Sequence, residues 1–273
     1  MSLLEQAERV LDRGIYYQYV LGIRKEFPEL NPVAATLLIA KSRAHVIKHK
    51  SRIEGYPLPK RGAAIFAGNH QYQGDNYKIC IAGVDQADRL TRAVVKKSLV
   101  VEGFSETDEY LQSIEAKIDS FEYRPLMAFV LKGVGSISVD RENPDRSFLE
   151  VTDAVIKSDQ MLGVFIQPHR YEDCFLRYLQ VGAATVARRH PDTPVYPCAF
   201  SGPPYVEDRL TILEPFTYNQ KVKELNRRIS VGEFTILVAD AITSAQPYII
   251  RADWKTRRAV ELARLTKLAS SAS

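Results

Sequence analysis

Residues 64 to 70, Ala64-Ile65-Phe66-Ala67-Gly68-Asn69-His70, place four apolar residues directly before a glycine and two polar residues. A short apolar run that ends in this way is typical of a buried strand with polar groups at its carboxyl end. In α/β proteins, reactive side chains lie at the carboxyl ends of such strands. The segment therefore predicts a sheet strand and, at its end, a functional site.

Similar short runs rich in β-forming residues recur along the chain, and helical patterns separate them. The further strands are expected at Arg92–Val95, Ser136–Val139, Leu162–Ile166 and Val195–Phe200. Helices are expected at Phe148–Lys157, Val181–His190 and over most of residues 221 to 265, with amphipathic stretches at Lys221–Arg228 and Trp254–Lys267. Strands that alternate with helices predict an α/β protein.

The first 52 residues differ from the rest and predict a helical hairpin. Residues 3 to 15 carry apolar side chains mainly at three- and four-residue steps with charged residues between them, which indicates an amphipathic helix. A second segment, apolar and then basic, runs from Val33 to Arg52. Two readings stay open: an ordinary packed helix pair, or an element that docks on a membrane through its apolar face and its basic residues. Residues 53 to 273 would form the second domain, with helices at its carboxyl end.

Composition places the chain among globular proteins. Of its 273 residues, 45% are hydrophobic and 26% charged, which excludes disordered and fibrous classes. The apolar stretches are shorter than the roughly 20 residues needed to cross a bilayer, and the first residues lack the pattern of a secretion signal. The three cysteines, Cys80, Cys174 and Cys198, have no metal-ligand spacing. We therefore expect a cytoplasmic protein without a metal site, and the scattered basic residues predict no nucleic-acid partner.

His70 and Asp75 are the candidate catalytic pair. A histidine can take a proton from an alcohol, and a carboxylate bonded to its other ring nitrogen fixes the tautomer and stabilises the imidazolium. Such a pair is a general-base dyad. A histidine and an aspartate five positions apart also occur by chance, and a loop histidine usually bonds only to backbone, so the context of the pair decides its meaning.

Four blocks of the sequence supply that context. The stretch Asn69–Asp75 resembles the first motif, Asn-His-x-Ser-x-x-Asp, of the glycerolipid acyltransferase family, which includes the lysophosphatidate and glycerol-3-phosphate acyltransferases. Val94–Leu99 is similar to the basic segment that follows this motif, and Gly133–Arg141 is similar to the second motif, which ends in Asp-Arg. Thr193–Ala199 resembles the fourth motif. The resemblance covers roughly residues 50 to 215 and implies a mixed β-sheet flanked by helices.

The third motif departs from the family pattern. Phe-Pro-Glu-Gly-Thr-Arg-Ser is matched by Phe165–Tyr171, which keeps only the Phe and the Arg. Gln167 stands for the glutamate and Pro168 for the glycine, so both charge and backbone freedom change. In the first motif, Tyr72 replaces the serine. These departures predict an acceptor other than ordinary lysophosphatidate, held in a bulkier and more aromatic pocket.

The resemblance implies a role for each candidate residue. His70 would be the general base and Asp75 its orienting partner. The expected substrate-binding residues are Arg141 and Arg170, which would hold an anionic part of the acceptor, together with Lys96, Lys97, Gln167 and His169. For the two lysines, a solvated surface charge is the alternative. Oxyanion donors would be backbone amides near Gly68, Gly133 and Gly135, an expectation that rests on their glycines.

The expected reaction moves a fatty acyl group from acyl-CoA or acyl carrier protein to a hydroxyl of a lysophospholipid or related lipid. It needs no metal and no cofactor beyond the acyl donor. The expected location is the cytoplasmic, inner face of a membrane, where the enzyme would be peripheral. Two alternatives remain: an acyltransferase of the same fold with an unusual non-glycerophosphate acceptor, and a lipid-binding homologue without turnover.

Overall fold

The computed structural model of the chain describes residues 31–71, 74–96, 124–139, 147–168, 176, 179–201 and 207–245. The chain divides into two compact units. The first contains Met1–His49, Leu58–Gly62 and Asn76–Leu162, and the second contains Lys50–Pro57, Ala63–Asp75 and Gly163–Ser273. The helices expected at residues 3 to 15 and at Trp254–Lys267 lie outside the described residues.

The second unit contains a mixed sheet. Its strands follow the order β1-β7-β6-β2 and have these bounds: β1 Arg52–Gly55, β7 Arg209–Ile212, β6 Val195–Ser201 and β2 Ala64–Gly68. β1 pairs with β7 and β2 pairs with β6 in parallel, whereas β6 and β7 are antiparallel. The end of strand β5 (Met161–Phe165) continues beside β2, because the N–H of Ile166 donates to the carbonyl of Gly68 at 2.8 Å.

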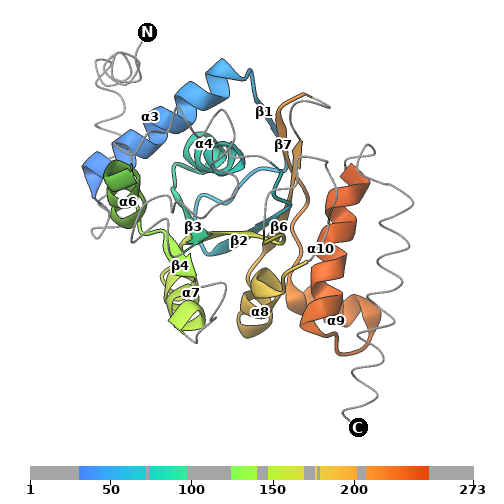
Figure 1. Cartoon of the computed structure of the whole chain (residues 1–273). Helices are drawn as coiled ribbons and strands as arrows, with labels where there is room; N and C mark the ends of the chain where they lie inside the picture. Colours follow the sequence, from blue (N-terminus) through green and yellow to red (C-terminus); the bar gives the residue numbers. More distant parts are fainter. Residues whose placement is uncertain are drawn as a thin grey trace. The chain divides into compact units, whose positions relative to one another are not determined.

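Helices α8 (Gly182–Arg189) and α10 (Val231–Ala245) cover strands of this sheet. They pack against each other, α8 against β2 and α10 against β6 (Figure 1). Helix α9 (Tyr218–Leu225) begins at a capping box, in which the side chains of Thr217 and Gln220 each bond the other's backbone N–H. Among the described residues of this unit, Phe66, Phe200 and Phe234 are large aromatic side chains that are fully buried.

The first unit contains helices and a parallel strand pair. Helix α3 (Pro32–Lys48) packs on α6 (Arg124–Gly133). Strand β3 (Thr91–Lys96) pairs in parallel with β4 (Ile137–Val139), and α7 (Ser147–Lys157) packs on β4. Helix α4 runs from Asp75 to Ala87. Asn31 begins α3, since its side-chain oxygen accepts hydrogen bonds from the N–H groups of Val33 and Ala34.

The predicted α/β class is confirmed. The five strands expected from the sequence are present within one or two residues of their predicted bounds. Strands β1 and β7 were not predicted. The basic segment predicted as helix up to Arg52 is helical only to Lys48, and Arg52 is already the first residue of β1. Within the described part of the chain, the helices are too short or too polar to cross a membrane.

The side chain of Arg89 holds two loops of the first unit together. It is only 3% exposed, and its guanidinium donates hydrogen bonds to the carbonyls of Pro59 at 3.1 Å, of Gly62 at 2.8 Å and of Asp159. These carbonyls belong to the loop before β2 and the turn before β5. A buried cation with several carbonyl partners contributes to stability because its removal leaves those carbonyls unsatisfied.

Arg89→Ala is therefore expected to lower the free energy of unfolding by about 2–4 kcal/mol. Urea denaturation followed by circular dichroism measures this loss. The matched control is Arg209→Ala, which also removes an arginine, but from an exposed network. If Arg89→Ala had the denaturation midpoint of the wild type, the hydrogen bonds from Arg89 to the two loops would not contribute to stability.

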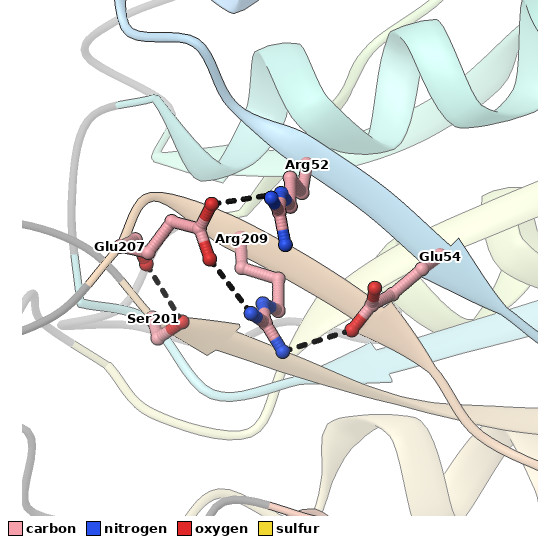
Figure 2. A network of polar contacts seen from close by, with 5 residues as sticks. All are labelled: Arg52, Glu54, Ser201, Glu207 and Arg209. Atoms are coloured by element: carbon pink, nitrogen blue, oxygen red, sulfur yellow. Dashed lines mark hydrogen bonds and ion pairs between the residues drawn. The ribbon is translucent and has the colours of Figure 1, made fainter.

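Arg209 belongs to an exposed network of ion pairs on β1, at the start of β7 and in the residues just before it. Figure 2 shows Arg209 between Glu207, at 2.7 Å, and Glu54, at 3.0 Å, while Arg52 contacts Glu207 at 2.8 Å. The hydrogen bond from Arg209 holds the pKa of Glu207 below its usual value, so this pairing stabilises at neutral pH and is lost as the pH falls. Exposed ion pairs are screened by water and salt. The loss in Arg209→Ala should therefore be much smaller than in Arg89→Ala.

Candidate active site

Strand β2 ends at Gly68, and the three residues that follow begin the site. Asn69 is buried, and its carboxamide bonds the backbone of Phe200 in both directions. Its Nδ2 donates to the carbonyl of Phe200 at 3.0 Å, and its Oδ1 accepts from the N–H of Phe200 at 2.8 Å. The Asn69 side chain thus continues the pairing of β2 with β6 beyond the end of the strand. This fixes the direction in which the chain presents His70.

His70 and Asp75 form the buried pair that the sequence predicted. The Oδ2 atom of Asp75 lies 3.1 Å from Nδ1 of His70 and accepts the N–H of Gln71 at 2.8 Å. Asp75 is fully buried and is the first residue of α4, where the helix dipole favours a carboxylate. A carboxylate facing Nδ1 holds the proton on that nitrogen and leaves the lone pair on Nε2. The pair can therefore act as a general base through Nε2.

An aromatic ring fixes the plane of the imidazole. The ring of Phe165, the last residue of β5, is stacked on His70 with centroids 4.0 Å apart and an interplanar angle of 12°. The ring of Phe200 is tilted against that of Phe165, and the two ring centroids are 5.8 Å apart. Together with the bond to Asp75, this stack restricts rotation of the imidazole. Preorganised groups of this kind avoid reorganisation during the reaction.

Gln167 contacts the backbone of the candidate base. Its side chain is 2% exposed, and its Oε1 accepts the N–H of His70 at 2.9 Å. Gln167, which stands in place of the glutamate of the third motif, therefore accepts a hydrogen bond from His70 of the first motif. A neutral carboxamide supplies this acceptor without adding a buried negative charge near Asp75. The substrate-binding role that the sequence predicted for Gln167 stays a prediction, and the contact that the structure shows is with the backbone of His70.

Gln167→Leu is expected to lower the free energy of unfolding by about 1–3 kcal/mol, because the N–H of His70 loses its buried acceptor. The turnover number should fall about tenfold as the base loses its fixed position. Thermal denaturation and steady-state kinetics measure both effects. A wild-type turnover number in Gln167→Leu would show that this hydrogen bond does not position His70.

The three glycines predicted as oxyanion candidates each have a packing or backbone reason. A Cβ atom on Gly68 would lie 2.5 Å from the ring of Phe200. In the first unit, a Cβ on Gly133 would collide with the Cβ of Ala34, where α3 crosses α6. Gly135 has a φ of +65°, which favours glycine. Packing or backbone conformation therefore explains why each of these three positions is a glycine, without any role in binding an oxyanion.

Most of the charged residues predicted for substrate binding lie outside the residues that the structure describes. Lys96 is the last residue of β3, in the first unit. Lys97, Arg141, His169 and Arg170 lie outside the described residues, as does Tyr72. Their roles stay predictions.

The described cysteines are poor candidates for nucleophilic catalysis. Cys80 and Cys198 are buried free thiols, and burial raises the pKa of Cys80 to about 11 and raises the pKa of Cys198 as well. Protonated thiols are weak nucleophiles. Among the residues with a described position, no group of three or more His, Cys, Asp or Glu side chains could hold a metal ion.

Comparison with known proteins gives no match from which the chemistry of the site could be inferred. No protein-family model matches the chain, and no protein of curated function matches its sequence. The site's chemistry therefore rests on its geometry and on the sequence motifs.

Proposed function

We propose that the chain is an acyltransferase that moves a fatty acyl group from a thioester, acyl-CoA or acyl carrier protein, to a hydroxyl of a lysophospholipid or related lipid. The observation that carries this proposal is the buried His70–Asp75 pair after β2, with its Nδ1 to Oδ2 distance of 3.1 Å. The ordered motif blocks around the pair support this chemistry over other uses of a general base.

In the proposed reaction, His70 acts first as a general base and then as a general acid. Its Nε2 takes the proton of the acceptor hydroxyl while the hydroxyl oxygen attacks the thioester carbonyl carbon. A C–O bond forms and gives a tetrahedral oxyanion, whose collapse breaks the C–S bond. The imidazolium then returns its proton to the leaving thiolate. Asp75 remains a carboxylate throughout and stabilises the imidazolium.

The acceptor differs from ordinary lysophosphatidate in this proposal. The Oε1 atom of Gln167 is engaged by the N–H of His70, at the position where the family has a glutamate. Arg141 and Arg170 would hold an anionic part of the acceptor through bidentate hydrogen bonds. An acceptor without a glycerophosphate group is the second candidate, because the residue at the position of the family's glutamate is bonded to the backbone of His70.

The proposed place of the reaction is the cytoplasmic surface of a membrane, with the protein bound peripherally. Near the end of α3, Ile47 is 67% exposed and lies next to the exposed Lys48 and Lys50. An exposed apolar side chain flanked by basic residues is the combination that interfacial docking uses.

Product analysis tests the function. The protein is incubated with acyl-CoA or acyl carrier protein and a panel of lysolipids with and without a phosphate group, and esters are identified by mass spectrometry. The proposal predicts an ester that requires both donor and acceptor. Binding of lipid without any ester product would instead identify a lipid-binding protein without turnover.

A further inference from the structure

Gln71 is a buried amide with no described role in holding the fold. Its backbone N–H donates to Oδ2 of Asp75, the same oxygen that faces His70. Its side chain is 4% exposed, and both Oε1 and Nε2 are fully enclosed. Neither atom has a hydrogen-bond partner among the described residues.

The two other buried amides described at the site have hydrogen-bond partners, unlike Gln71. Asn69 makes two hydrogen bonds to Phe200, and Gln167 accepts from His70. Leaving a buried amide unsatisfied costs about 1–3 kcal/mol, so such groups in folded proteins are rare. An unsatisfied buried group in a folded protein requires an explanation, and a catalytic role is one of those that occur. The position of Gln71 directly after the base makes a reacting ligand the natural partner.

We propose that the Nε2–H group of Gln71 donates a hydrogen bond to the carbonyl oxygen of the acyl thioester as that oxygen becomes an oxyanion. This inference rests on the proposed function. A glutamine amide is a known type of oxyanion donor, and a donor enclosed away from water acts more strongly. The glycines predicted for this role are explained by packing or by backbone conformation, whereas the free amide of Gln71 is not.

The proposal predicts opposite effects on activity and stability. Gln71→Leu removes the amide at similar volume, and kcat should fall about 10²- to 10³-fold. The thermal midpoint should stay equal or rise, because an unsatisfied buried group is removed. The matched control is Gln86→Leu in α4, where Oε1 also has no partner among the described residues. This control should leave kcat unchanged.

The outcomes separate this proposal from the function on which it rests. Turnover that is abolished in His70→Ala but stays within twofold of wild type in Gln71→Leu overturns the role of Gln71 alone. Absence of ester product from the wild type overturns both proposals. Gln71→Met provides a second, unbranched apolar variant in case leucine disturbs folding. A lowered thermal midpoint in both variants would assign Gln71 a structural role and overturn the inference.

Discussion

Asp75→Asn is expected to lower kcat about 10²- to 10⁴-fold while the protein keeps its fold. Asparagine has the same size but carries no charge, and only one end of its amide can take the place of Oδ2, the atom that both accepts the N–H of Gln71 and faces Nδ1 of His70. If the amide oxygen takes that place, the imidazolium loses the negative charge that stabilises it. If the amide nitrogen takes it, Nδ1 must be unprotonated. The ring proton moves to Nε2, and the lone pair no longer faces the acceptor hydroxyl. Both orientations weaken the base.

Asp85→Asn is the matched control for this prediction. Asp85 lies on the same helix, α4, but it is exposed and paired with Arg43. Its substitution should change kcat less than twofold. Steady-state kinetics on both variants, with circular dichroism as a check of folding, makes the comparison. Asp75→Asn with more than half of the wild-type kcat would show that Asp75 does not orient the base.

Phe200→Ala is expected to lower the free energy of unfolding by about 3–5 kcal/mol. The Phe200 side chain is fully buried, packs over Gly68 and contacts the ring of Phe165. Its removal opens a cavity beneath the end of β2, where close packing allows little relaxation. The hydrogen bonds from Asn69 involve only the backbone of Phe200, so this loss reports packing rather than polar contacts.

Phe129→Ala removes the same side chain from α6, where Phe129 is 42% exposed. This control should change the free energy of unfolding by less than about 1 kcal/mol. Urea denaturation curves with a shared m-value compare the two variants. A loss below about 1 kcal/mol for Phe200→Ala as well would show that the packing at the end of β2 does not stabilise the unit.

The sequence predicted the buried strands well and the edge strand poorly. β2 and β6 are continuous apolar runs, which makes them recognisable without any partner. β1, Arg-Ile-Glu-Gly, has mostly exposed side chains, and its pattern is that of a polar loop. Its strand state comes from parallel pairing with β7, more than 150 positions later in the chain. Pairing over such a separation leaves no local signal.

In the candidate site, too, contacts between residues far apart in the sequence could not be predicted. His70 and Asp75 could be found because they belong to one short motif. The hydrogen bond from the His70 N–H to Gln167 joins residues 97 positions apart, so only the structure reveals it. Asp75 is also the first residue of α4, a helix that the sequence did not predict. Gln71 was missed because burial without a partner is invisible in a sequence.

The rate of ester formation by His70→Ala, compared with the wild type at saturating acyl donor and lysolipid, tests the central claim most directly. If His70 is the base, the variant should retain its circular dichroism spectrum and lose about 10³-fold or more in kcat. Equal rates in the two proteins would contradict acyl transfer by the His70–Asp75 pair.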